Sequence, residues 1–265
     1  MKTRIISGLV MAPLLIIVYL GGPVLTLGCF LIGIIGSREF YNGFAAMGVK
    51  ASYAITCIAA LALYAIDMFL PTASQYYVPL LQLWFFGVVL ASCLYLFKID
   101  ERQPADATAT ITGTFYVVFF SYHVTLTEQS GEYGMLVWLI FLTAFGTDIM
   151  AYFTGYFLGK HKLCPKISPK KTIEGSIGGV IGSVVLSALF GYFFFERILI
   201  HCIIIGIIGG IVSQFGDLTA SVFKRKMGIK DYGNLIPGHG GILDRFDSVL
   251  FTAPMVYYYI MLVLS

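Results

Sequence analysis

Long apolar runs, separated by short polar or Gly/Pro-containing segments, make up most of this 265-residue chain. A membrane-spanning helix needs about 20 mostly apolar residues, and these runs do not alternate as the strands of a membrane barrel do. The pattern predicts an all-α integral membrane protein with about nine transmembrane helices. The spans are predicted at Ile5–Leu20, Pro23–Gly36, Ser52–Leu70, Pro79–Phe97, Ala109–Thr127, Gly134–Leu158, Ile173–Phe195, Ile198–Phe223 and Phe246–Leu264.

The basic residues sort to one side of this arrangement. With the N-terminus in the cytoplasm and alternating loops, 16 of the 17 basic residues fall inside and only Arg197 falls outside. Cytoplasmic loops of membrane proteins carry such an excess of Lys and Arg. The distribution predicts a cytoplasmic N-terminus and a C-terminus on the opposite side. The first apolar run lacks a small-residue cleavage site, so it is interpreted as a retained span and not a signal peptide.

Composition supports a membrane protein. The chain is 58% hydrophobic and 12% charged, whereas soluble domains carry about 25% charged residues. A soluble globular enzyme, a disordered chain and a disulfide scaffold are thereby excluded. The net charge of +3 gives no argument for a nucleic-acid partner. The five cysteines form no Cys-x-x-Cys pair, so their spacing excludes a structural zinc site.

The charges that remain are concentrated in two inside loops. Five basic residues lie between Lys160 and Lys171, and five more lie between Lys224 and Arg245. Short turns need only a few charges for orientation, so these loops are interpreted as a working site. We expect residues 1–130 to be a scaffold of transmembrane helices that could supply homodimer contacts, and 131–265 to be the catalytic region. In spans seven and eight, small residues spaced four apart favour close helix packing: Gly175/Gly179, Gly178/Gly182 and Gly206/Gly210.

Several acidic residues are predicted inside spans, where they are costly and usually functional. Asp148 lies mid-span in the sixth helix and Asp217 lies in the eighth. Asp244 and Asp247 open the ninth, three residues apart and on one helical face. One interpretation is simple neutralisation of Asp217 and Asp244 by a neighbouring lysine or arginine. The other is a Mg²⁺ site, since this ion takes carboxylate oxygens together with substrate phosphates.

The two loops have the chemistry of phosphate binding. Pro237-Gly238-His239-Gly240-Gly241 is a glycine-rich turn directly before a helix start, where backbone N–H groups can approach an anion. The segment from Ser168 to Gly175 adds two lysines, two hydroxyls and the carboxylate of Glu174. The alternative for Lys170 and Lys171 is contact with anionic lipid headgroups.

These segments resemble the signature of phosphatidate cytidylyltransferases (CDP-diacylglycerol synthases). The match runs through Ser221-Val222-Phe223-Lys224-Arg225, then Lys230-Asp231, then the stretch from Pro237 to Asp247. Gly216-Asp217 and the Ser168–Gly175 segment also resemble the family. The resemblance is specific from about Asp148 onward, whereas the first 130 residues match only as generic apolar spans.

The resemblance implies transfer of CMP from CTP to phosphatidate, giving CDP-diacylglycerol and pyrophosphate in phospholipid biosynthesis. It implies Mg²⁺ held by Asp217 and Asp244, and a second cation such as K⁺ has been proposed for the family. It places the protein in the bacterial inner membrane, among membrane lipid, with its active site facing the cytoplasm.

The candidate residues fall into two groups. Those expected to act on the reacting phosphates are Asp217, Asp244, Asp247, Lys224, Arg225 and Arg245. Those expected to bind substrate are Lys170, Lys171, Ser168, Thr172, Glu174, Ser221, Lys230, Asp231, His239, Gly240, Gly241 and Asp148.

Other classes of membrane protein make different demands. A CTP-dependent lipid kinase would share CTP, Mg²⁺ and a lipid acceptor but would release CDP in place of pyrophosphate. A transporter would carry intramembrane charges on several helices and signs of an internal repeat. CDP-alcohol phosphatidyltransferases carry an Asp-Gly-x-x-Ala-Arg segment, which this chain lacks.

Overall fold

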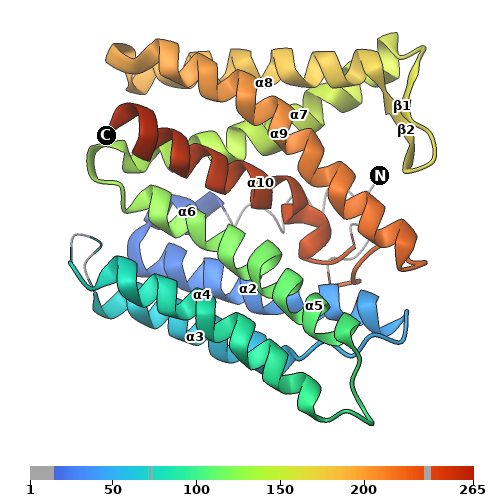
Figure 1. Ribbon diagram of the computed structural model, residues 1–265. Helices are drawn as coiled ribbons and strands as arrows, with labels where there is room; N and C mark the ends of the chain where they lie inside the picture. Colours follow the sequence, from blue (N-terminus) through green and yellow to red (C-terminus); the bar gives the residue numbers. More distant parts are fainter. Residues whose placement is uncertain (1–14, 71, 73, 236–239) are drawn as a thin grey trace. The chain divides into compact units, whose positions relative to one another are not determined.

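The computed structural model describes residues 15–70, 72, 74–235 and 240–265 (Figure 1). Among them, six helices are long and apolar enough to cross a membrane, and the helix Tyr53–Phe69 is apolar but shorter. The predicted helical membrane protein is therefore confirmed. The count of nine spans and the orientation of the termini stay predictions, and most of the first predicted span lies outside the described residues.

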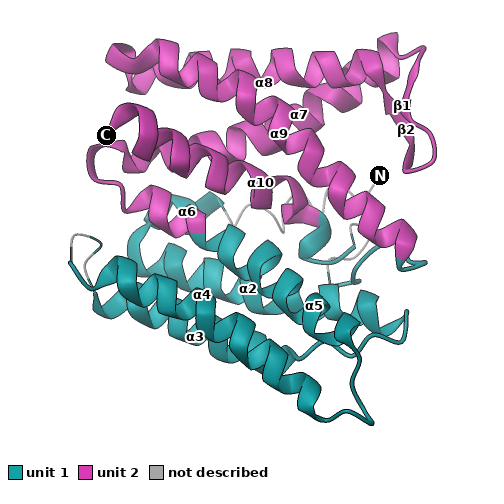
Figure 2. Ribbon diagram, in the orientation of Figure 1, with its two compact units in different colours: residues 1–122, 227–244 teal, residues 123–226, 245–265 magenta. Residues whose placement is uncertain are grey.

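The chain forms two compact units (Figure 2). The first contains residues 1–122 and 227–244, and the second contains residues 123–226 and 245–265. Residues 227–235 and 240–244 group with the first unit. The division into a scaffold, 1–130, and a catalytic region, 131–265, stays a prediction.

The first unit is built from helices that follow the predicted apolar runs. They are α2 (Gly22–Ala45), α3 (Tyr53–Phe69), α4 (Tyr77–Leu94), the 3₁₀ turn η1 (Tyr95–Phe97), α5 (Pro104–Gly113) and the π-helical turn η2 (Thr114–Phe119). Tyr41 links three of them, because its hydroxyl lies 2.6 Å from Thr56 Oγ1 and donates to the Thr110 carbonyl at 2.9 Å. These bonds satisfy polar groups that would be costly to bury alone.

Helix α2 corrects the prediction of a short second span ending at Gly36. It runs for 24 residues and carries Arg38 and Glu39 within its last turns. A charged pair does not end a helix, because Arg and Glu are both good helix formers. Glu39 is buried whereas Arg38 is exposed. The change from apolar to charged residues after Gly36 therefore does not mark the end of the helix.

The second unit holds the longest helix, α9, and a β-hairpin. Its elements are α6 (Phe120–Glu128), η3 (Gly131–Leu136), α7 (Val137–Leu158), β1 (Lys162–Cys164), β2 (Ser168–Thr172), α8 (Ile173–Phe194), η4 (Glu196–Ile198), α9 (Leu199–Lys226), α10 (Leu243–Tyr259) and η5 (Ile260–Leu264). The first residues of α6, up to Tyr122, and of α10, up to Asp244, belong to the first unit.

Glycines allow α7, α8 and α9 to pack closely, as their spacing predicted. A β-carbon at Gly179 would lie 2.9 Å from the Thr147 carbonyl of α7, and one at Gly206 would lie 2.9 Å from the Ser187 side chain of α8. Small residues at such positions let helix backbones approach one another. The predicted close packing of spans seven and eight is confirmed.

One short β-hairpin accompanies the predicted helical fold. Strands β1 and β2 are antiparallel, with Lys162 opposite Thr172 and Cys164 opposite Ser168. Strands this short and this charged carry no alternating apolar pattern, so sequence periodicity could not reveal them. The hairpin holds the first basic loop in a defined shape between α7 and α8.

Candidate active site

A cavity of about 510 Å³ lies within the second unit. It is lined by residues of α7, the hairpin, α8 and α9. Its charged lining consists of Asp148, Lys162, Lys170, Lys171 and Asp217. Four of these five were predicted as site residues, and the hairpin brings three lysines to one wall. The cavity therefore combines cationic groups for an anion with carboxylates for a cation.

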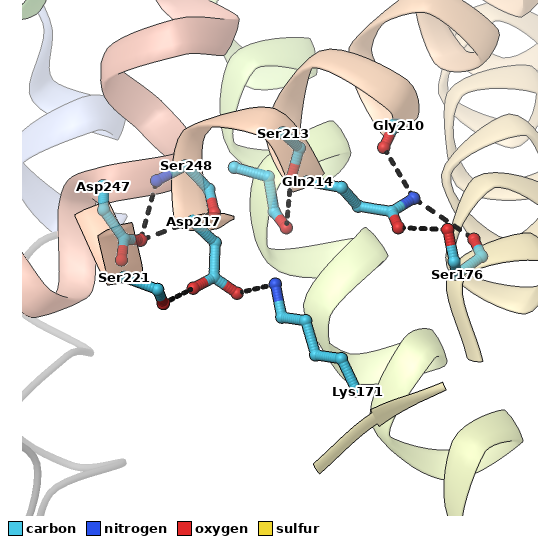
Figure 3. Close-up of polar contacts among 10 residues, drawn as sticks. Lys171, Ser176, Gly210, Ser213, Gln214, Asp217, Ser221, Asp247 and Ser248 are labelled. Carbon is cyan, nitrogen blue, oxygen red and sulfur yellow. Dashed lines mark hydrogen bonds and ion pairs between the residues drawn. The ribbon is translucent and has the colours of Figure 1, made fainter. Parts of the chain in front are cut away.

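Asp217 lies at the centre of this arrangement (Figure 3). Its Oδ2 forms an ion pair with the Lys171 ammonium group, and its Oδ1 accepts a hydrogen bond from Ser221 at 3.4 Å. Ser221 is one helical turn further along α9, so both side chains lie on the same face. About a quarter of each charged side chain is exposed (Lys171 26%, Asp217 24%). The pair is therefore within reach of a ligand in the cavity.

Two further carboxylates lie in the electrostatic range of Asp217. Asp148 comes from α7 and Asp247 from the first turns of α10. Asp247 is buried, and its Oδ1 accepts a hydrogen bond from the backbone N–H of Ser248 at 2.7 Å (Figure 3). Three acidic side chains from three helices thus lie in one region. Cations nearby stabilise the ionised form of carboxylates placed so close together.

The structure supplies cations from several elements of the same unit. Lys171 and Arg245 lie in electrostatic range of Asp148, and Lys224 lies in range of Asp247. All three were predicted as site residues from their positions in the two basic loops. The predicted neutralisation of Asp217 by a neighbouring lysine is observed in the pair with Lys171.

Polar contacts fix the helices that carry these groups. Gln214 of α9 accepts a hydrogen bond from the Ser176 hydroxyl of α8 at 2.5 Å and donates to the Ser176 carbonyl at 3.1 Å (Figure 3). Gln214 lies one turn before Asp217. This bonded pair therefore sets the register of α9 against α8 at the level of the site.

Glycine at position 216 lets α10 approach α9. A β-carbon there would lie 2.7 Å from the Asp247 carbonyl and 3.1 Å from the Ser248 α-carbon. Any side chain would push these backbones apart. Gly216 thereby allows Asp217 and Asp247 to lie in one region.

Three of the predicted substrate-binding residues lie in or beside the hairpin, and one of them, Thr172, also lines the cavity. The Thr172 hydroxyl accepts a hydrogen bond from Gly175 N–H at 3.1 Å and caps α8. Glu174 accepts bonds from the backbone of Lys160 and His161 and lies 2.6 Å from the His161 ring nitrogen. Ser168 lies in β2. Arg225, expected to act on the phosphates, donates to the Ile167 carbonyl at 3.2 Å.

The oxygen donors of the cavity fit a hard divalent cation such as Mg²⁺. This ion is usually held by one or two carboxylates together with water and substrate phosphates. Asp148 and Asp217 offer carboxylates in the cavity lining, and the Ser221 hydroxyl is hydrogen-bonded to Asp217. In the part of the chain that the structure describes, no group of three His, Cys, Asp or Glu side chains is arranged to hold a metal ion. The donor set fits an ion shared with substrate phosphates.

The other predicted residues lie in the first unit. Asp244 Oδ2 accepts hydrogen bonds from the backbone N–H groups of Tyr232, at 2.8 Å, and Gly241, at 2.9 Å. Gly240 has a φ of +83°, which favours glycine. Lys230 and Asp231 are exposed, and His239 lies outside the described residues. The pairing of Asp217 with Asp244 joins residues of different units and stays a prediction.

Comparison with known proteins gives one family. A family model described as "Cytidylyltransferase family" matches residues 2–263. The chain belongs to the cytidylyltransferase family. It is 34% identical to a phosphatidate cytidylyltransferase of Synechocystis sp., over 98% of this chain and 97% of that protein. It is 36% identical to one of Staphylococcus haemolyticus, over 96% of this chain and 95% of that protein. The predicted family is confirmed.

Lys162 and Gln214 are among the residues of this cytidylyltransferase's cavity that were not predicted as site residues. Lys162 was counted only as an inside charge, because the hairpin that turns it toward Lys170 and Lys171 was not foreseen. Gln214 lies one turn before Asp217 in an apolar helix. A polar amide within a span is the signal that could have identified it.

Proposed function

We propose that this membrane protein is a phosphatidate cytidylyltransferase. It transfers the CMP moiety of CTP to phosphatidate and releases CDP-diacylglycerol and pyrophosphate, a step of phospholipid biosynthesis. The observation that carries the proposal is the cavity of the second unit. There Lys162, Lys170 and Lys171 lie beside Asp148 and Asp217 in an otherwise apolar helical body. Anionic phosphates and a bridging cation together match this lining.

The reaction requires little covalent chemistry from the protein. A phosphate oxygen of phosphatidate is already anionic near neutral pH, so it attacks the α-phosphorus of CTP without a strong base. The bond from the α-phosphorus to the bridging oxygen breaks, and pyrophosphate leaves with its electron pair. The protein has to orient two anions and neutralise their charge.

The cavity residues divide these tasks by charge. Lys162 and Lys170 lie on the hairpin and face the cavity, where they can bind the phosphates. Lys171 is paired with Asp217 and can exchange that partner for a substrate phosphate. The exchange releases Asp217 to bind a cation, so anion and cation binding reinforce one another.

Mg²⁺ would be held by Asp217 with Asp148 in this cavity. The predicted ligand Asp244 belongs to the first unit, and its part in holding Mg²⁺ stays a prediction. When bound, this ion would neutralise the CTP phosphates and stabilise the leaving pyrophosphate. Asp247 is buried behind the Ser248 backbone and would support this charge arrangement without facing the cavity. A second cation such as K⁺ has no further support among the described residues.

The apolar wall of the cavity suits a lipid substrate. Two exposed aromatic side chains of α7, Tyr152 and Tyr156, line the same cavity as the three lysines. Tyrosine favours positions where one end of the ring is apolar and the other is wet. We place the phosphatidate headgroup at the lysines and its acyl chains along this helix.

Orientation in the membrane follows from the basic residues. We propose nine spans, a cytoplasmic N-terminus and a cytoplasm-facing site in the bacterial inner membrane, because CTP is cytoplasmic and both basic loops then lie on that side. A homodimer is compatible with this arrangement.

The assignment of Asp217 is tested by Asp217→Asn. Loss of this carboxylate is expected to lower the rate of Mg²⁺-dependent CDP-diacylglycerol formation by about 100-fold or more, the scale of losing one stabilising group. Asp100→Asn, an exposed loop residue of the first unit, is the matched control and should keep wild-type activity. A near-normal rate with unchanged Mg²⁺ dependence in Asp217→Asn would sink the assignment.

A further inference from the structure

Glu39, a buried carboxylate of the first unit, contacts residues 242 and 243, which lie 203 and 204 positions further along the chain. These residues belong to the signature segment, here residues 221–247. Glu39 of α2 accepts a hydrogen bond from Ile242 N–H at 3.0 Å through Oε1, and one from Leu243 N–H at 2.8 Å through Oε2. Its exposure is 7%. These amides open α10, where N–H groups lack partners within the helix.

The signature segment is shaped to receive this carboxylate. A β-carbon at Gly233 would lie 2.6 Å from Glu39 Oε1, and one at Gly241 would also overlap the carboxylate. Phe40, the next residue of α2, lies with its ring centroid 5.9 Å from that of Tyr232. Glycine at positions 233 and 241 therefore leaves space for the Glu39 carboxylate that a larger residue would occupy.

Asp244 and Glu39 together accept hydrogen bonds from the backbone N–H groups at the start of α10. The N–H of Gly241 donates to Asp244 Oδ2, and the next two N–H groups, of Ile242 and Leu243, donate to Glu39. The amide of Gly241, in the glycine-rich turn predicted from sequence to bind a phosphate, and the next two amides are thereby bound by carboxylates of the protein itself. The start of α10 is preorganised before any substrate binds.

We propose that Glu39 is a positioning residue for the reaction, which holds the start of α10 and thereby fixes the carboxylate of Asp244. It touches neither substrate in this role. A glutamine there keeps one oxygen and replaces the other with an NH₂ donor, so one of the two amides, of Ile242 or Leu243, loses its acceptor and the backbone that Asp244 binds is loosened. The activity arm of its test rests on the proposed cytidylyl transfer, whereas its structural arm does not.

The test compares Glu39→Gln and Glu39→Asp with Glu101→Gln, a control at an exposed carboxylate of the same unit. Hydrogen–deuterium exchange of the backbone amides at 240–246 is measured on full-length enzyme in detergent without metal or substrate. Glu39→Gln turns a donor toward a donor, so exchange there should be about tenfold faster. Exchange in α8 should not change. Glu39→Asp keeps the charge with a shorter reach and should lie between.

The second readout is the Mg²⁺ concentration that gives the half-maximal rate, which does not depend on the fraction of active protein. It should rise about tenfold in Glu39→Gln, the lower end of what loss of a group supporting a metal ligand costs. Unchanged exchange in Glu39→Gln and Glu39→Asp would overturn the anchoring. Faster exchange with wild-type Mg²⁺ dependence would overturn the positioning role. Because exchange needs no catalysis, failure of the proposed reaction would be recognised separately.

Discussion

Lys171 and Asp217 show how one residue pair can serve both substrate binding and charge balance. In the structure they neutralise each other within the cavity. Both are partly exposed, so solvent weakens the pair and a phosphate can compete for the lysine. The ion pair between Lys171 and Asp217 can therefore break when a substrate phosphate binds Lys171.

Replacing this lysine should separate binding from folding. Lys171→Gln removes a cation that we assign to a substrate phosphate, and kcat/KM should fall about 10–100-fold, the value of one charged hydrogen bond. Lys171→Arg keeps the charge and should retain more of the activity. Steady-state kinetics with CTP and phosphatidate varied in turn measures both.

The matched control is Lys98→Gln, at an exposed lysine of the first unit. It should leave kcat/KM unchanged. Equal losses in Lys171→Gln and Lys98→Gln would mean that positive charge matters for lipid contact in general and not for this site.

At the scale of elements, close approach of α9 and α10 depends on a residue without a side chain. Gly216→Ala places a β-carbon against the Asp247 carbonyl. The free energy of unfolding in detergent should therefore fall by roughly 1–3 kcal/mol, the usual cost of overpacking, and the melting temperature should fall with it. Gly87→Ala in α4 meets no atom within 4 Å. That control should be neutral or gain about 0.5–1 kcal/mol from helix propensity. Equal melting temperatures for the two variants would contradict the packing argument.

Long apolar helices were predictable, because a helix that crosses a bilayer needs about 20 consecutive, mostly apolar residues. The hairpin was not, because β1 and β2 are too short to carry a period, and what turns Lys162 toward the cavity is pairing of Lys162 with Thr172. Glu39 was missed for a related reason. The predicted second span stops at Gly36, before Glu39, whereas contacts with Ile242 and Leu243 bury this carboxylate within the fold.

The site itself was predictable in composition and only partly in role. Asp148, Asp217 and Lys171 lie at one cavity as expected. Thr172 lines this cavity and also caps α8, whereas Glu174 accepts hydrogen bonds from the backbone near the hairpin. A hydroxyl or carboxylate can cap a helix as readily as it binds a ligand, and only the fold decides which.

For the whole molecule, orientation in the membrane can be tested at the two ends of α9. Cysteines are introduced singly as Arg197→Cys and Lys226→Cys, both exposed positions, and cells are treated with a membrane-impermeant maleimide. The positive-inside distribution predicts labelling from outside at position 197 and none at 226 until the membrane is opened. The wild-type chain measures background labelling of the native cysteines. The reverse pattern would contradict the proposed topology.

The reaction class is tested most directly by following the phosphorus atoms of CTP. Purified protein is mixed with phosphatidate, Mg²⁺ and CTP labelled at either the α- or the γ-phosphorus. CMP transfer predicts that the α-label enters the lipid and the γ-label leaves in pyrophosphate, in equal amounts. Entry of the γ-label into lipid with release of CDP would identify a kinase, and absence of both labels from lipid would contradict the cytidylyl transfer proposed for this cavity.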